Sequence, residues 1–288
     1  MDLAIPYGAL VGPQMAAKLD RAAALGPDMI RVDLYSQNVE AEGWAAADAM
    51  VDAIRARGIR ILLILNGPRG WNIWETREQR IAWAQWAREA VARYEGRIWA
   101  WQVANEPNKR GNSSGVQGMP AALYADLLKR TGAAIRSQSA RPIVMAGISP
   151  VPDGTPGNGP AVPYVRALAA AGIADFVDVL ACHVYSGTVL APAAGAWQTM
   201  LRVRAELPLP VWITELGAST GGSNPCTEQF QADLVRSCAA ARPTWLKRLF
   251  WYTLDDTSNG GTAGNQGGFG AYRLDATPKP VAAALRSA

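Results

Sequence analysis

The sequence contains little of what metal centres and disulfide frameworks need. Its 288 residues include one histidine and three cysteines. Histidine-based metal sites draw on several histidines, so we expect neither a metal nor another cofactor. Cys226 and Cys238 flank one expected helix, which at 1.5 Å per residue would hold them about 18 Å apart, too far for a disulfide. Cys182 lies in an apolar run, and we expect it to be a buried thiol.

Long apolar runs and basic clusters are also missing. No run approaches the roughly 20 residues of a membrane-spanning helix. The net charge of +4 is spread along the chain, without a basic patch interleaved with aromatic residues, so nucleic-acid binding is not expected. The chain opens on a strand-like segment, from which we expect no signal peptide, and the localisation stays open.

What the sequence does contain is ample material for a core, with 49% hydrophobic and 18% charged residues. Short and almost continuously apolar runs recur along the chain, as in parallel strands buried on both faces. The predicted strands are Leu3–Pro6, Met29–Leu34, Ile59–Leu65, Ile98–Ala104, Ile143–Ala146, Val177–Val184, Val211–Thr214 and Leu246–Tyr252.

Amphipathic, alanine-rich segments alternate with these runs. The predicted helices are Pro13–Leu25, Ala45–Arg57, Thr76–Tyr94, Ala121–Ser137, Val162–Ala171, Ala196–Glu206, Glu228–Ala241 and Pro280–Ser287. Strict strand–helix alternation predicts a parallel sheet, and eight repeats in about this length favour a closed barrel over an open sheet. We therefore predict the α/β class, with residues 1–288 forming a single (β/α)₈ TIM barrel domain.

The longest connections follow strands rather than helices. They are Asn108–Met119, Ser149–Ala161, Gly217–Asn224 and Asp255–Tyr272, all rich in Gly, Asn, Ser and Pro. Barrels of this kind carry their active sites on the loops after the strands, so function is expected at that face.

Two glutamates stand at the ends of predicted strands, Glu106 after the fourth and Glu215 on the seventh. Across a barrel mouth they would face each other. Two carboxyl groups about 5 Å apart can cleave an acetal, one protonating the leaving oxygen while the other attacks the anomeric carbon. This chemistry needs one carboxyl group with a raised pKa and one with a low pKa.

Further polar residues at the strand ends fit such a site. Arg31 could hold Glu215 ionised, and Asn105 could hydrogen-bond a sugar 2-hydroxyl. We expect His183 and Tyr185 to position and electrostatically tune Glu215.

Other residues are candidates for sugar contacts. Trp251 offers an apolar floor for a sugar ring, while Asn66 and Asp255 lie at strand ends. Trp71 could form a further subsite, although packing remains the alternative for it and for its neighbours Trp74, Trp83 and Trp86.

These motifs resemble a known group of enzymes. The segment WQVANEPN (Trp101–Asn108) resembles the Asn-Glu-Pro acid/base motif of clan A glycoside hydrolases, and VWITELG (Val211–Gly217) resembles their nucleophile strand. Matching features also occur in order at IRVDL, CHVY and LFWYTLDD, so the resemblance covers essentially the whole barrel. It is greatest to family 39 and its neighbours, with family 5 next. The resemblance implies a retaining reaction with Glu106 as acid/base and Glu215 as nucleophile.

From this we expect a carbohydrate substrate, endo-acting cleavage of a β-linked polysaccharide outside the cell or in its envelope, and a monomeric protein. The alternatives are an exo-acting glycosidase and a carbohydrate-binding barrel of the same clan with little turnover. A Schiff-base aldolase would need a lysine at the mouth. Lys109 and Lys247 lie near strands, but neither is expected to face the mouth.

Overall fold

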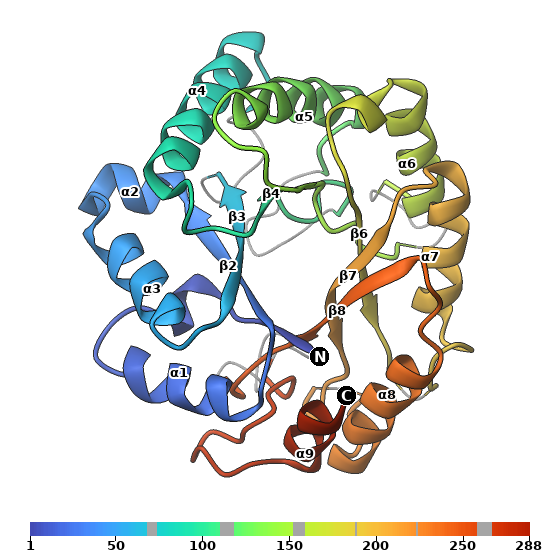
Figure 1. Cartoon of the computed structure of the whole chain (residues 1–288). Helices are drawn as coiled ribbons and strands as arrows, with labels where there is room; N and C mark the ends of the chain where they lie inside the picture. Colours follow the sequence, from blue (N-terminus) through green and yellow to red (C-terminus); the bar gives the residue numbers. More distant parts are fainter. Residues whose placement is uncertain (68–73, 110–117, 152–158, 188, 223, 258–266) are drawn as a thin grey trace.

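The chain folds into a barrel of parallel strands (Figure 1). The computed structural model describes residues 1–67, 74–109, 118–151, 159–187, 189–222, 224–257 and 267–288. The strands are β1 (Asp2–Ala4), β2 (Met29–Tyr35), β3 (Arg60–Asn66), β4 (Ala100–Val103), β5 (Ile143–Val144), β6 (Leu180–Tyr185), β7 (Val211–Gly217) and β8 (Leu246–Tyr252).

The eight strands run in the order β5-β4-β3-β2-β1-β8-β7-β6, and neighbouring strands pair in parallel. Between β5 and β6 the isolated bridges Val144–Val179 and Ile148–Cys182 take the place of a continuous ladder and bring the ring close to closure. The predicted (β/α)₈ barrel is therefore confirmed, and the C-terminal ends of the strands meet on one face.

Helices form an outer ring around the strands, as Figure 1 shows. They are α1 (Met15–Ala24), α2 (Ser36–Glu42), α3 (Ala45–Arg55), α4 (Arg77–Tyr94), α5 (Ala121–Arg136), α6 (Ala161–Ala170), α7 (Gly195–Glu206), α8 (Glu228–Ala240) and α9 (Pro280–Ser287), with short 3₁₀ turns η1 (Tyr7–Ala9) and η3 (Ile173–Asp175). Helix α2 was not predicted from the sequence, because its two turns are mostly polar and have no apolar period.

Local sequence explains where the longer helices begin and end. Thr76 caps α4 in a capping box, in which Gln79 N donates to Thr76 Oγ1 at 3.2 Å and Thr76 N donates to Gln79 Oε1 at 2.8 Å. Thr227 accepts a hydrogen bond from Phe230 N at 3.0 Å at the start of α8. Beyond α3, Gly58 adopts a φ of 72°, which is the left-handed conformation typical of helix ends.

The strand side chains divide into two layers. An inner cluster fills the barrel with Ala4, Met29, Leu62, Ala100, Val144, Val179, Ala181, Trp212 and Phe250. The alternate strand residues join a larger cluster between strands and helices. Because successive side chains of a strand point to opposite faces, membership of the inner cluster shows which residues of each strand point into the barrel.

The cysteines and the helices agree with two expectations from the sequence. Cys226 and Cys238 do not pair with each other, as predicted, and Cys182 is a buried thiol, also as predicted. All three cysteines are free, and Cys238 is buried as well. No helix within the described ranges is long and apolar enough to cross a membrane.

Candidate active site

Regular alternation along two strands delivers polar side chains to the barrel mouth. On β2 the inner residue Met29 is followed two positions later by Arg31, and on β6 Ala181 is followed by His183 and then by Tyr185. Arg31 and His183 are buried, and Tyr185 is partly exposed. These side chains reach the mouth without any departure from ordinary strand geometry.

Glu106 reaches the mouth through irregular backbone after β4. Ala104 and Glu106 have φ values of 65° and 44°, in the left-handed region that costs a non-glycine residue about 1–3 kcal/mol. The backbone groups are nevertheless satisfied, since Ala104 N donates to Leu65 O at 2.9 Å and Glu106 N donates to Gly147 O at 3.1 Å. The consecutive residues Asn105 and Glu106, which a regular strand would point to opposite faces, both contact inward-facing groups.

A β-bulge turns Glu215 into the barrel. Cys182 of β6 pairs with Ile213 of β7, but the next residue, His183, pairs with Glu215, so Thr214 is passed over. With strict alternation, the side chain of Glu215 would point to the same face as that of Ile213, which faces the helices. Bulges beside active sites commonly re-aim a side chain in this way.

Both oxygens of Glu215 are held by neighbours. Arg31 Nη1 donates to Glu215 Oε1 at 2.7 Å, and the Tyr185 hydroxyl donates to Oε2. The same guanidinium donates through Nη2 to Asn105 Oδ1 at 2.6 Å and through Nε to Gln102 Oε1 at 2.7 Å. Arg31 therefore links β2, β4 and β7 and fixes the orientation of the Glu215 carboxylate.

His183 lies between the two glutamates. Its Nδ1 is 2.9 Å from Glu106 Oε1 and 3.4 Å from Glu215 Oε2, so it contacts Glu106 more closely than the expected Glu215. Its Nε2 is buried without a hydrogen-bond partner among the described residues. The opposite side of the ring faces Gly147, where a Cβ would stand 2.0 Å from Nε2. A proton on Nδ1 satisfies this arrangement, because a proton on Nε2 would be a buried donor without an acceptor.

Lys109 completes the surroundings of Glu106. Its Nζ lies 2.9 Å from Glu106 Oε2, so the expectation that Lys109 does not face the mouth is wrong. The reason is a turn in which Lys109 N donates to Glu106 O at 3.1 Å. Asn108 anchors this turn by donating to Ser149 O at 2.9 Å and accepting from Ser149 N at 3.0 Å.

The two glutamates and His183 form one compact group. One ligand-type atom from each residue lies within 4.8 Å of the others, a spacing that a metal ion could also bridge. However, Arg31 and Lys109 are ion-paired with the two carboxylates at 2.7 and 2.9 Å, so a cation bound there would face two positive charges. The donor set fits proton transfer and nucleophilic attack better than metal binding.

The charges around the site shift several pKa values. Burial alone would raise the pKa of Glu106, but the hydrogen bond from His183 and the charge of Lys109 outweigh it and hold that pKa well below its usual range. Burial, reinforced by the negative charge of Glu215, raises the pKa of Tyr185 far above its ordinary value. Tyr185 therefore remains a hydrogen-bond donor to Glu215.

Trp251 does not contribute an exposed floor to the mouth. It is fully buried in the layer between strands and helices, which corrects the sequence prediction. The inner residue of β8 is Phe250, so alternation brings Tyr252 rather than Trp251 to the mouth. The Tyr252 ring packs edge-on against Tyr185 and Phe269, with centroids 6.2 and 5.8 Å apart.

The remaining candidates lie in different surroundings. Asn66 donates to Asp33 Oδ1 at 3.2 Å beside the mouth. Asp255 accepts two hydrogen bonds of 2.9 Å from Arg21 of the outer helix α1. It therefore links α1 to the segment after β8 and is not a free subsite residue. Trp71 lies outside the described residues.

Some members of this group were not found from the sequence. Strand alternation could have identified two of them. Gln102 is a polar residue in the middle of an apolar strand, and Tyr252 lies two residues beyond the inward-facing Phe250. Lys109 and Gly147 carried no such signal, because their roles depend on contacts between different loops.

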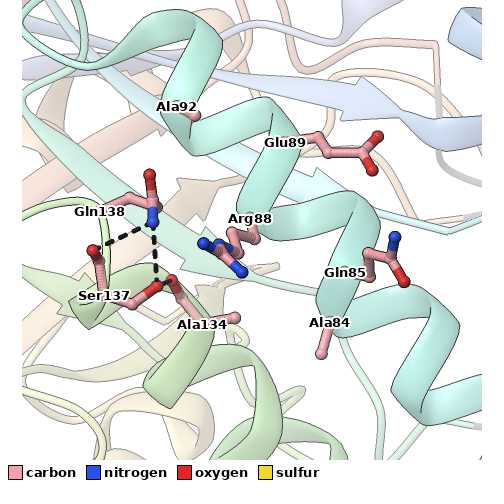
Figure 2. Close-up of a pocket in the computed structure, with 8 residues that line it drawn as sticks. All are labelled: Ala84, Gln85, Arg88, Glu89, Ala92, Ala134, Ser137 and Gln138. Atoms are coloured by element: carbon pink, nitrogen blue, oxygen red, sulfur yellow. Dashed lines mark hydrogen bonds between the residues drawn. The ribbon is translucent and has the colours of Figure 1, made fainter.

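A surface groove lies elsewhere on the barrel. It has a volume of about 620 Å³ and runs between α4 and α5, lined by Ala84, Gln85, Arg88, Glu89, Ala92, Ala134, Ser137 and Gln138 (Figure 2). These residues lie on α4, at the C-terminal end of α5 and directly after it, and none belongs to the group around Glu106 and Glu215.

Comparison with known proteins supports the chemistry of this face. A family model described as the glycosyl hydrolase catalytic core matches residues 72–269, which include both Glu106 and Glu215. No curated protein gives a significant match.

Several solved structures that share this fold are described as glycoside hydrolases or glycosidases. A family 39 enzyme from the gut symbiont Bacteroides cellulosilyticus WH2 matches with a TM-score of 0.71 and 21% identity, over 99% of this chain and 62% of that one. A monomeric β-xylosidase from Caulobacter crescentus CB15 gives 0.69 and 20%, over 99% and 67%. A GH5_18 enzyme from Streptomyces cattleya gives 0.72 and 16%, over 99% and 78%. These likenesses show the fold, and this chain spans less than two thirds of the length of the family 39 structure.

Proposed function

Because the chain belongs to the glycosyl hydrolase catalytic-core family, we propose that it is a retaining glycosidase with Glu106 as acid/base and Glu215 as nucleophile. The observation that carries this proposal is the spacing of the carboxylates, since one oxygen of each lies within 4.8 Å of an oxygen of the other and of a ring nitrogen of His183. Retaining enzymes place their carboxyl groups about 5–5.5 Å apart, whereas inverting enzymes leave about 6.5–9.5 Å for a water molecule.

In the first step Glu215 attacks the anomeric carbon while Glu106 gives its proton to the leaving oxygen. Arg31 and Tyr185 hold the Glu215 carboxylate in one orientation through the bonds to Oε1 and Oε2. Such preorganisation lowers the barrier because no reorientation is needed as the new bond forms. The product of this step is a glycosyl-enzyme ester on Glu215.

In the second step Glu106, now a carboxylate, takes a proton from water, and the resulting nucleophile cleaves the ester. Asn105 Oδ1 already accepts a hydrogen bond from Arg31, so the amide nitrogen of Asn105 is the group left to donate to the sugar 2-hydroxyl. Tyr252 takes the place of Trp251, which was predicted from the sequence, as the aromatic residue that contacts the sugar ring.

For the substrate we propose endo-acting cleavage of a β-linked polysaccharide outside the cell or in its envelope, by a monomeric enzyme without a cofactor. The short segments after β1 and β2, η1 and α2, support an open groove on that side. Sizing the products by mass spectrometry tests this, and release of monosaccharides alone would contradict endo action.

The mechanism is tested with a panel of 4-nitrophenyl β-glycosides and the matching 2-deoxy-2-fluoro glycosides. We expect turnover of at least one glycoside and a covalent fluoroglycosyl adduct on Glu215, found by peptide mass spectrometry. The Glu106→Gln variant should lose about 10²–10⁴-fold in rate on substrates with poor leaving groups.

The exposed Glu89→Gln variant is the matched control, since Glu89 lies on the outer face of α4. Rates of Glu106→Gln and Glu215→Gln equal to that of Glu89→Gln would refute the assignment. Sugar binding without turnover or adduct would favour the carbohydrate-binding barrel instead.

A further inference from the structure

The proposed mechanism assigns no role to Lys109, although the Lys109 ammonium group contacts the carboxylate of the acid/base Glu106 directly. Glu106 Oε1 faces the imidazole of His183, which is fully buried, at 2.9 Å. The oxygen that can face a leaving group is therefore Oε2, and Lys109 Nζ lies 2.9 Å from it. The ammonium group of Lys109 thus stands where the leaving-group side of a substrate must approach.

Lys109 is able to exchange its partner. Its side chain is 38% exposed, whereas that of Arg31 is 4% exposed and bonds three acceptors. Lys279, another lysine near the strand ends, is 1% exposed and is held by Asp256 at 2.8 Å. The four-carbon stem of Lys109 gives its charge a range of positions, while the Asn108 anchor fixes its backbone.

While the ammonium stays on Oε2, it favours the ionised form of Glu106, which cannot donate a proton. A second anion near Lys109 would draw the ammonium away and add its own negative charge, and both changes favour the protonated acid. Neutral sugars offer no such anion, but uronic acids and sulfated sugars do.

We infer that Lys109 binds an anionic substituent, a carboxylate or a sulfate ester, on the leaving-group sugar, and that this binding frees Glu106 Oε2 to take up the catalytic proton. The inference rests on the proposed function. The proton comes from solvent, enters Oε2 as the ammonium pairs with the substrate anion, and passes to the glycosidic oxygen as its bond to the anomeric carbon breaks.

The leaving-group subsite can be tested by measuring how the enzyme transfers its glycosyl group to added acceptor sugars. This experiment needs no knowledge of the natural substrate. The donor is the 2,4-dinitrophenyl β-glycoside of the sugar that the nitrophenyl panel identifies, since dinitrophenolate departs without acid catalysis. The acceptors, at equal concentration, are methyl β-glucoside, methyl β-glucuronide and methyl β-glucoside 6-sulfate. The transfer products are quantified by mass spectrometry.

We expect about fivefold or more transfer to one charged acceptor over the glucoside at low salt, and less at high salt. The preferred acceptor identifies the anion as carboxylate or sulfate. In Lys109→Met the ratio should fall to about one, whereas Lys109→Arg should keep a preference. Lys247→Met removes an equal charge from an exposed site at the opposite end of the barrel and should keep the wild-type ratio.

Equal transfer to all three acceptors by the wild-type protein, or a preference that survives in Lys109→Met, would overturn the inference while leaving the retaining mechanism intact. Absence of any dinitrophenolate release or glycosyl-enzyme would instead overturn the proposed function, and this inference with it. A pH profile gives a second readout. The alkaline limb of kcat/KM for a neutral substrate should move to higher pH in Lys109→Met, because removal of the ammonium raises the pKa of Glu106.

Discussion

A single methyl group at Gly147 should disable the site. A Cβ at this position would stand 2.0 Å from His183 Nε2 and 2.5 Å from its Cδ2, short of ordinary contact by about 1 Å or more. The φ of Gly147 is not in the left-handed region, so Gly147→Ala tests the side chain rather than the backbone.

The imidazole has no room to retreat. It is fully buried, and on the side away from Gly147 its Nδ1 already lies 2.9 Å from Glu106 and 3.4 Å from Glu215. Overpacking of this kind costs about 1–3 kcal/mol of stability. Displacement of catalytic groups by about 1 Å can cost about 100-fold in rate, so we expect kcat/KM to fall by about that factor.

Urea unfolding and kcat/KM are measured for Gly147→Ala, His183→Ala and the double variant. Once His183 is removed, Gly147→Ala should have little further effect on stability, because its steric partner is gone. Gly195→Ala at the start of α7, with no heavy atom within 4 Å, is the control. A Gly147→Ala protein as stable and as active as Gly195→Ala would refute the steric argument.

Further outcomes follow from other contacts. Trp251→Ala should lower the unfolding free energy by about 3–5 kcal/mol because it empties a core position, whereas Tyr252→Ala should lower kcat/KM with a smaller loss of stability; the reverse pattern in thermal melts and kinetics would restore Trp251 to the site. Arg31→Met should cost about 3–5 kcal/mol in urea unfolding, since it leaves the buried Glu215 charge unpaired, and an unchanged midpoint would contradict that. The lowered pKa of Glu106 adds stability that is present above its unfolded pKa of about 4.3 and is lost as pH falls toward the folded value. Wild type should therefore lose more unfolding free energy between pH 5 and pH 3 than Glu106→Gln, and parallel curves would show that the shift is absent. EDTA should leave turnover unchanged, and loss of activity restored by a divalent metal would point to the metal-binding alternative.

Most of the fold could be predicted from patterns that are local in the chain. Apolar runs that alternate with amphipathic segments predicted the barrel, because burial on both faces of a parallel strand demands a continuous run. Strand ends in such a barrel share one face, so the positions of Glu106 and Glu215 along the chain predicted that they lie opposite each other. The length of the helix between Cys226 and Cys238 likewise predicted that these two cysteines do not pair.

The directions in which strand side chains point were harder to predict from the sequence, because they depend on single-residue irregularities. The bulge at Thr214 and the left-handed φ of Ala104 and Glu106 have no clear signature in these residue types. A shift of one residue exchanges the two faces of a strand, which is why Trp251 was assigned to the mouth that Tyr252 occupies.

The sequence by itself determined the barrel and the pair of carboxylates, since both follow from periodicity and from position at strand ends. Only the tertiary structure decided what surrounds each carboxylate. His183 against Gly147 and Lys109 on Glu106 arise from the packing of separate βα segments, and the pKa of an acid depends on such neighbours in space rather than on neighbours along the chain.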